Sequence, residues 1–542
     1  MASWHRTWCE LAPSRKRAGR RRARQAKGVS RSAWPNRIVS ACGAAIGALA
    51  VGVLLQVPPA DAAVPGRGFL PEGRGWEQVS PTDKNGTDIL EIDGYTKAAI
   101  GGDAVAYAAF GGFAETPTLQ GPASYIARRQ SSGWVTTPIL PLQTSAEPGT
   151  TVLARLGLSR DLRFSVLRAG DPAPTAGVTP GTTNLYLRDN LLGTYTLLTP
   201  VGAPQGPTVE VAYNGSFAGA SDDFRHIVFE SSVRLTPDAP IDLPGGGFAA
   251  PTNLYEWADG ELRLVGILPS GVPAAGGAFA GRARAGGGLG GATGSNYTEQ
   301  AVSRDGKRIY WTDAGTQQLY VRLDGQTTRH VSASQRTVPE APRPTVFQGA
   351  TPDGRVAFFT SEEKLTDDAT ASGSSAELYA FDIETGRLRD LSVSPTGTGA
   401  GVVGFLGASD DGETVYFAAN ESLTAEAADH EDVSGPKLYR WRSGEVKYIT
   451  TFEPNSVVTQ LNWSLNKVRA PRASRVTPDG RYLLFTSTLP VPPTASDAPG
   501  PEQLYLHDAE TDTTRCISCV PGESEPTHPA TLTESGTFVF SG

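Results

Sequence analysis

The sequence predicts an all-β protein, a β-propeller of four-stranded antiparallel blades, with eight blades preferred and seven as the alternative. Turn-forming residues are abundant, with 62 Gly and 41 Pro among 542 residues, and they separate short β-rich runs. One sequence unit also recurs through most of the chain. A repeated unit that cannot bury its own apolar faces must stack against its neighbours, as blades around a common axis do.

The first half of the repeated unit is a turn followed by a strand. Ser or Thr and any residue precede Asp-Gly or Asp-x, and an alternating apolar run follows, as in residues 303–311 (SRDGKRIYW). Asp-Gly between β-runs predicts a hairpin, because Gly adopts positive φ without strain and Asp bonds to the nearby backbone. We therefore assign a structural role to the turn aspartates, which are Asp161, Asp223, Asp305, Asp353, Asp411 and Asp479.

The second half of the unit contains Leu-Tyr, and it follows each of these turns. The six pairs begin at Leu185, Leu254, Leu319, Leu378, Leu438 and Leu504. A second turn, such as Asp324-Gly325, separates the Leu-Tyr strand from the last strand, so each unit supplies four strands. A weaker copy covers residues 102–127, and half a copy covers residues 533–540. The count is therefore seven full blades and two strands of an eighth.

The two ends of the chain are expected to close the ring together. Residues 75–80 (GWEQVS) resemble an outer strand without a blade of its own, so the segment 63–97 is expected to supply a closing strand to the final blade. The propeller itself is assigned to residues 98–542, with a glycine-rich loop at 271–295. The end at Ser541-Gly542 leaves a second interpretation open, a fragment of a longer protein.

These repeats resemble those of the TolB-like, or WD40-like "PD40", propeller family, which follow the pattern S-P-D-G-[KR]-x-[IL]-x-[FY] and then [DE]-L-Y. The resemblance covers about residues 66–542 and implies that Asp-Gly joins the first two strands of a blade and that Leu-Tyr lies in the third. It also implies a partner in the cell envelope. The partner-binding N-terminal domain of TolB itself is not recognisable before residue 98, so the same partner is not assigned. Propellers host many functions, so the resemblance implies the fold better than the activity.

Residues 1–62 have the features of a secretory signal peptide. Residues 1–37 carry eleven Lys or Arg, an apolar run extends from Ile38 to Val57, and Ala60-Asp61-Ala62 supplies small residues for cleavage between Ala62 and Ala63. The apolar run is also long enough to span a bilayer, so an uncleaved membrane anchor is the alternative. Either interpretation predicts that the remaining chain is secreted or otherwise extracytoplasmic.

The charge of the exported part argues against nucleic acid as a partner. Without residues 1–62, Lys plus Arg falls from 48 to 37 and Asp plus Glu from 56 to 54, a net charge of −17. Such a surface repels phosphate backbones and anionic lipids. We expect a monomer that binds no nucleic acid and that meets a membrane only through its N-terminal segment, if that segment is uncleaved.

Two cysteines remain in the exported part, Cys516 and Cys519. In an oxidising compartment they are expected to form a disulfide that staples a loop. A redox C-x-x-C or half of a zinc site is the alternative, but no second C-x-x-C and no βαβ pattern accompany them.

No motif in the sequence predicts a catalytic, cofactor-binding or metal-binding residue. There is no G-x-S-x-G and no H-E-x-x-H, and the exported histidines have no zinc-like spacing; they are His226, His330, His430, His507 and His528. Calcium in the acidic loops is the remaining candidate, at residues 429–432 and at Glu362, Glu363, Asp367 and Asp368. Solvated loops without a metal are the interpretation we favour.

The sequence therefore favours an exported TolB-like binding or scaffold module for a protein, a peptide or a glycan of the cell envelope. The alternative is a carbohydrate-active propeller enzyme, a glycosidase or lyase that uses carboxylates from several blades. Carboxylates about 5–10 Å apart at the channel mouth would distinguish the enzyme from the binding module.

Overall fold

The computed structural model describes fourteen stretches of the chain. They are residues 77–90, 96–109, 111–113, 123–139, 154–169, 175–178, 184–199, 216–243, 251–281, 300–454, 474–493, 497–519, 529–532 and 538–540. The predicted signal peptide, its cleavage site at Ala62 and Ala63, and His528 lie outside these residues. No helix in the described part of the chain is long and apolar enough to cross a membrane.

The described residues form seven four-stranded antiparallel sheets in which each strand pairs with the next one in sequence. Blade 1 contains β1 (Lys97–Ala98), β2 (Ala104–Ala109), β3 (Ala123–Gln130) and β4 (Gly133–Pro138), and blade 2 contains β5 (Ala154–Leu158), β6 (Phe164–Ala169), β7 (Asn184–Asp189) and β8 (Thr194–Leu197). Blade 3 contains β9 (Ser216–Ala220), β10 (His226–Ser231), β11 (Asn253–Ala258) and β12 (Glu261–Leu264), and blade 4 contains β13 (Ala278–Ala280), β14 (Arg308–Asp313), β15 (Leu319–Leu323) and β16 (Thr327–His330).

The remaining three blades repeat this order. Blade 5 contains β17 (Thr345–Ala350), β18 (Val356–Ser361), β19 (Glu377–Asp382) and β20 (Arg387–Asp390). Blade 6 contains β21 (Val402–Ala408), β22 (Thr414–Ala419), β23 (Lys437–Arg442) and β24 (Glu445–Thr451), with the single turn of helix α1 (Ala425–Ala428) before β23. Blade 7 contains β25 (Ser474–Val476), β26 (Tyr482–Ser487), β27 (Gln503–Asp508) and β28 (Thr513–Cys516). A two-stranded sheet of β29 (Ala530–Leu532) and β30 (Phe538–Phe540) follows.

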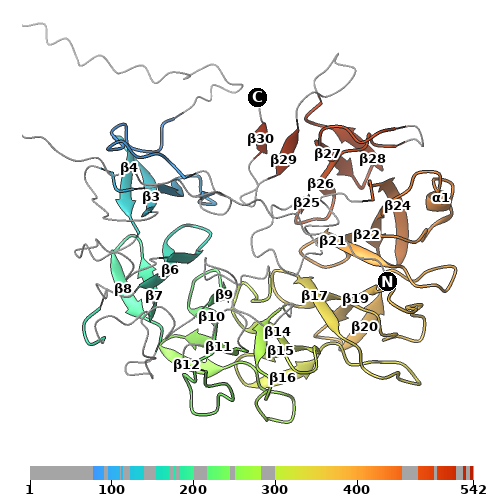
Figure 1. The fold of residues 1–542 in the computed structure, drawn as a ribbon, viewed down its shortest axis with the longest axis horizontal. Helices are drawn as coiled ribbons and strands as arrows, with labels where there is room; N and C mark the ends of the chain where they lie inside the picture. Colours follow the sequence, from blue (N-terminus) through green and yellow to red (C-terminus); the bar gives the residue numbers. More distant parts are fainter. Residues whose placement is uncertain are drawn as a thin grey trace, which may run out of the picture. The chain divides into compact units, whose positions relative to one another are not determined.

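The predicted fold class is confirmed, with the alternative count of seven full blades. Within the Trp76–Gly542 unit, the first strand of blades 3, 5 and 6 lies nearest the middle and the fourth lies outermost (Figure 1). The eighth repeat supplies only β29 and β30 among the described residues, so the preferred count of eight complete blades needs correction.

The expected closing strand is also not seen where the chain is described. Residues 77–80 form no strand, and Gly75 and Trp76 lie outside the described residues. The Glu77 carboxylate instead contacts blade 1, where it accepts hydrogen bonds from Arg129 at 2.7 Å and from the Trp134 indole at 2.8 Å. These contacts attach the segment to the two outer strands of the first blade.

The predicted glycine-rich loop at 271–295 is in part a strand. Ala278–Ala280 is β13, the first strand of blade 4, and its three side chains are buried. Apolar residues suit this position because the strand packs against β10 and β11 of blade 3. The Gly281 N–H donates to the Tyr310 carbonyl, and the Tyr310 N–H donates to the Ala301 carbonyl. Tyr310 lies in β14, which pairs with the first strand, so the residues on both sides of the insertion 282–299 lie along the first-strand side of β14. Residues 282–299 themselves lie outside the described residues.

The turn motif is built identically in six repeats. The hydroxyl at its first position donates to the Asp carboxylate at 2.5–2.6 Å, as Ser303 does to Asp305. The same carboxylate accepts the N–H of the fifth position at 2.9–3.1 Å, and the hydroxyl oxygen accepts the N–H of the sixth at 2.8–3.0 Å. All six predicted turn aspartates, from Asp161 to Asp479, therefore order the turn itself.

The tyrosine of Leu-Tyr fastens the loop between the second and third strands. In blade 5 the Tyr379 hydroxyl donates to the carbonyl of Glu363 at 2.9 Å and accepts the N–H of Leu365 at 3.3 Å. Tyr255 and Tyr439 make the same pair of contacts in blades 3 and 6. Because these hydroxyls are buried, each one needs such partners.

Neighbouring blades pack through two fixed positions of the repeat. The sixth residue of one turn motif lies against the fourth residue of the next, which is Gly306, Gly354, Gly412 or Gly480 with φ of 71–75°. A Cβ at Gly480 would lie only 2.7 Å from the Cβ of Thr414. Close approach therefore demands glycine there, apart from its left-handed backbone.

Candidate binding surface on the turn face

The candidate site is the edge of the blades where strand 1 turns into strand 2 and strand 3 into strand 4, here called the turn face. Strands 1 and 3 of an antiparallel sheet run in the same direction, so these two turns must lie at one edge. The Asp-containing motif forms the first turn of each blade.

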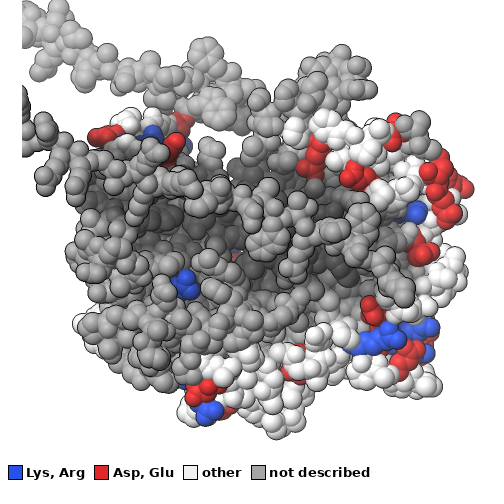
Figure 2. Space-filling model, in the orientation of Figure 1, with Lys and Arg blue, Asp and Glu red and all other residues white. Residues whose placement is uncertain are grey.

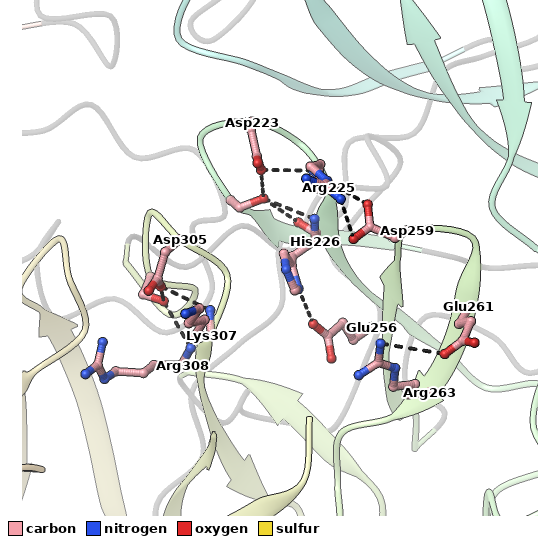
Figure 3. A network of polar contacts seen from close by, with 12 residues as sticks. Asp223, Arg225, His226, Glu256, Asp259, Glu261, Arg263, Asp305, Lys307 and Arg308 are labelled. Carbon is pink, nitrogen blue, oxygen red and sulfur yellow. Dashed lines mark hydrogen bonds and ion pairs between the residues drawn. The ribbon is translucent and has the colours of Figure 1, made fainter. Parts of the chain in front are cut away.

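An ion pair joins the two turns within four of the blades. Arg at the fifth position of the motif meets Asp of the second turn in Arg163–Asp189, Arg225–Asp259, Arg355–Asp382 and Arg481–Asp508, with distances of 3.2, 2.7, 3.4 and 2.9 Å. The Arg225 pair is bidentate and solvent-exposed (Figure 3). The Arg481 hydrogen bonds lower the pKa of Asp508 to about 2. Exposed ion pairs of this kind contribute little to the stability of the fold. Their effect is to fix which charged side chains face each other on the turn face.

Backbone hydrogen bonds join the turns of successive blades. The N–H at the second position donates to the carbonyl at the second position of the next motif, from Asp222 to Arg304 at 2.8 Å and from Arg304 to Pro352 at 2.8 Å. The same bond runs from Asp410 to Pro478 at 2.7 Å. Proline lacks the donor but keeps the carbonyl, so it fits where the motif only accepts.

The side chains at this second position form a chain of alternating charges. Arg160 and Arg304 both lie near the carboxylate of Asp222, at 3.7 and 3.9 Å, and Arg304 also lies 3.7 Å from Asp410. Arg304 belongs to blade 4 and Asp410 to blade 6, so this pair reaches past blade 5, whose own second position is Pro352. The four side chains are 44–47% exposed and remain available to a partner.

A pocket opens on the turn face between blades 4 and 5. Its volume is about 300 Å³, and it is lined by Asp305, Lys307, Arg308, Leu323, Asp324 and Ile383. Blade 4 supplies five of these residues and blade 5 supplies Ile383. Among the ligand pockets of proteins, this volume is at the small end.

Beside this pocket, a histidine and a glutamate of blade 3 are paired in a buried position. His226 Nδ1 lies 2.6 Å from Glu256 Oε1, and the Glu256 side chain is 2% exposed (Figure 3). A Cβ at Gly306 would lie 2.4 Å from the His226 ring, so this imidazole fills the junction between blades 3 and 4. His226 therefore has a packing role.

The other described histidines also lie in contacts within the protein. His330 stacks on Tyr320 with ring centroids 4.6 Å apart, and His430 stacks on Tyr448 at 5.4 Å. Burial lowers the pKa of His507 to about 4, so this side chain is neutral. No three His, Cys, Asp or Glu side chains in the described part of the chain gather as a metal site would require.

In the acidic loops considered for calcium, Asp367 and Glu363 accept hydrogen bonds from the protein itself. Asp367 accepts hydrogen bonds from the Thr337 N–H at 2.9 Å and its hydroxyl at 2.7 Å. Glu363 is buried and accepts the N–H of Arg343. The acidic run 429–432 follows α1, and acidic side chains gather at that edge of the molecule (Figure 2).

Two further sequence predictions concern cysteines and carboxylates. Cys516 and Cys519 form a disulfide with a Cα–Cα distance of 5.6 Å at the end of β28.

Asp390 and Glu377 form a pair of neighbouring carboxyls in blade 5, but Glu377 has no exposed surface. Burial and the adjacent Glu377 carboxylate raise the pKa of Asp390 well above its usual range. Both residues belong to blade 5, so this pair is not the set of carboxylates from several blades that the enzyme alternative expects.

Sequence reasoning did not single out Lys307, Arg308 or the charges at the second motif position. A signal was present, because aligning the six motifs shows Arg at the fifth position in blades 2, 3, 5 and 7, but Lys307 in blade 4 and Glu413 in blade 6. The turn-face geometry that makes this difference meaningful appears only in the folded chain.

No protein-family model matches the sequence, and no curated protein matches it. Among solved structures, dipeptidyl peptidase 4 of Porphyromonas gingivalis is similar, with 10% identity and a TM-score of 0.44 over 86% of this chain. A manganese complex of oligogalacturonate lyase has 15% identity and a TM-score of 0.36, covering 80% of this chain and 93% of that one. The propeller domain of the Trilobed protease from Pyrococcus furiosus has 10% identity and a TM-score of 0.30, covering 81% and 99%.

The chain spans only 60% of the dipeptidyl peptidase and 54% of a similar prolyl endopeptidase. At these identities and TM-scores, the similarities carry no argument about ligand or activity. The propeller architecture therefore rests on the seven four-stranded sheets themselves.

Proposed function

We propose that this chain is an exported, TolB-like β-propeller that binds a protein or peptide partner of the cell envelope on its turn face. The observation that carries the proposal is the chain of alternating charges on the turn face. Four blades contribute one side chain each, in the order Arg160, Asp222, Arg304 and Asp410. Backbone hydrogen bonds to neighbouring turns fix the main chain at these four residues before a partner arrives. A surface that is ordered in advance loses less entropy on binding.

The charges also suit a protein partner better than a uniformly charged polymer. Positive and negative side chains alternate over a short distance, so a complementary partner must present both signs in register. A net charge of −17 outside the leader argues against nucleic acid. The basic, apolar N-terminus and the resemblance of the repeats support an envelope location.

The test is capture of partners from an envelope extract with the immobilised chain and two charge-reversed variants. Arg160→Glu changes the turn face, and Arg234→Glu changes an exposed arginine in the loop after β10, at the opposite edge of the blades. We expect a captured protein to be lost with Arg160→Glu and kept with Arg234→Glu. Equal capture by both variants would refute the turn face as the binding surface.

The carbohydrate-active enzyme remains the rival hypothesis. Incubation of the purified chain with envelope and plant polysaccharides, followed by detection of reducing ends or unsaturated products, tests it directly. Turnover abolished by a carboxylate substitution on the propeller would replace the binding proposal.

A further inference from the structure

Blade 4 departs from the repeat at the fifth motif position. The matching Arg225 of blade 3 is ion-paired with Asp259, but blade 4 has Lys307 there and Asp324 in the second turn. The backbone relation is kept, because the Asp324 N–H donates to the Lys307 carbonyl at 2.7 Å as the Asp259 N–H does to Arg225 at 3.2 Å. Yet the Lys307 ammonium and the Asp324 carboxylate form no ion pair with each other or with other described side chains.

The sixth motif position is also different in blade 4. Arg308 occupies it, where the other five motifs have Phe164, His226, Val356, Thr414 and Tyr482. Arg308 reaches into blade 5, where its Nη1 donates to the Asp353 carbonyl at 2.9 Å and its Nη2 lies 4.0 Å from Glu384. These contacts hold the guanidinium in place, and the Arg308 side chain is 24% exposed. The Arg308 guanidinium, which is held by blade 5, therefore lies next to the Lys307 ammonium, which forms no ion pair with a described side chain.

The pocket between blades 4 and 5 lies at these two cations. Leu323 and Ile383 supply apolar wall, and Asp305 and Asp324 supply carboxylates. One oxygen of Asp305 accepts from the Ser303 hydroxyl at 2.6 Å and the Lys307 N–H at 3.1 Å. Asp324 therefore remains the carboxylate most available to a ligand, beside two cations.

We propose that this pocket binds the C-terminal residue of a peptide, with its carboxylate against Lys307 and Arg308. Cationic nitrogens form short, charge-assisted hydrogen bonds with a carboxylate, and these are stronger than neutral ones. The last peptide N–H lies close to that carboxylate and can donate to Asp324, which accounts for an acid in a cationic pocket. An apolar last side chain contacts Leu323 and Ile383. The site rests on the proposed function, because it would anchor a peptide on the turn face.

The probe is acetyl-Ala-Leu with a free carboxylate, compared with the same dipeptide as its C-terminal amide. Binding to the full chain is measured by isothermal titration calorimetry at low ionic strength. We expect the amide to bind at least about 10-fold more weakly, because a charge-assisted pair is lost. Glucuronic acid is titrated in parallel as a carboxylate carried by a sugar.

Lys307→Gln and Arg308→Gln are each expected to weaken the free-acid probe by about 10-fold or more. The matched control is Lys447→Gln, because this lysine pairs with Asp512 and does not line the pocket. Urea unfolding of each variant shows that the fold is kept. A variant that is folded and binds as tightly as the unchanged chain overturns the assignment.

Each other outcome is decisive. Equal affinity for the acid and the amide, or no binding of either, overturns the proposal. Binding of glucuronic acid without binding of the peptide acid overturns the peptide and favours a glycan. If Lys307→Gln captures the envelope partner as the unchanged chain does while Arg160→Glu does not, the pocket assignment fails but the proposed function stands.

Discussion

Replacing Gly480 with alanine should destabilise the junction between blades 6 and 7. The new Cβ would lie 2.7 Å from the Cβ of Thr414 and 2.9 Å from that of Ser409. The backbone sets the position of a Cβ, so no side-chain rotation relieves this contact. The left-handed backbone at φ of 71° adds a cost of about 1 kcal/mol, and overpacking adds about 1–3 kcal/mol. We expect the free energy of unfolding to fall by about 2–4 kcal/mol.

The matched control is Gly444→Ala in the second turn of blade 6. Its φ is 93°, also left-handed, but a Cβ there would have no atom within 4 Å. Only the backbone cost remains, so we expect a loss of about 1 kcal/mol. Leu162 and Phe224 occupy the position of Gly480 in blades 2 and 3 with φ of 58° and 56°, which shows that the backbone conformation alone is tolerated.

The assay is urea unfolding followed by tryptophan fluorescence and by far-ultraviolet circular dichroism. Coincident transitions allow the two free energies of unfolding to be compared. Equal losses for the two variants would refute the reasoning, because they would show that contact with the preceding blade contributes nothing. A smaller loss for Gly480→Ala than for Gly444→Ala would refute it more strongly.

Three further predictions concern single side chains. Tyr379→Phe should lower the free energy of unfolding by about 1–3 kcal/mol, because the buried Glu363 carbonyl and Leu365 N–H lose their partner; an unchanged urea midpoint would contradict this role. Asp390→Asn should reduce the loss of stability that accompanies rising pH. The folded-state pKa of Asp390 is raised, so its contribution is present at low pH and is lost as pH rises through that pKa. Urea unfolding from pH 5 to 9 tests this, and parallel profiles for the two proteins would be contrary to it. Arg225→Ala should change stability by less than about 1 kcal/mol in the same assay, because its ion pair with Asp259 is exposed; a loss above about 2 kcal/mol would show that the bridge is structural.

Local chemistry explains why the blade could be predicted from the sequence. The Ser303-x-Asp305-Gly306 turn is held by contacts within six residues, so its motif is visible in a single segment of chain. Alternation on either side assigns each residue of strands such as Val356–Ser361 to a face of the sheet. The repeat therefore predicted an all-β chain of four-stranded units. Six copies with a weaker seventh predicted seven full blades, but the preferred total of eight, with the half copy at 533–540 completed by the N-terminal segment, was wrong.

Contacts between distant segments explain what the sequence missed. The inner strand Ala278–Ala280 was assigned to a loop, because Gly and Ala dominate the segment around Phe279 and no alternating pattern marks a strand before blade 3 packs on it. Glu77 was expected beside the last blade but bonds to Arg129 and Trp134 of the first. Both outcomes depend on which surfaces meet across many residues, and no local pattern encodes that.

The candidate site has the same origin. Sequence alone identified Asp305 as a turn residue and gave no reason to choose Lys307 or Arg308 among many cations. Their significance arises because blade 5 brings Ile383 beside them and because the ion pair of the neighbouring blades is not formed there. Short-range hydrogen bonds made the four-stranded unit predictable from the sequence. The chain of charges and the pocket were decided only by tertiary packing, because their residues come from different blades.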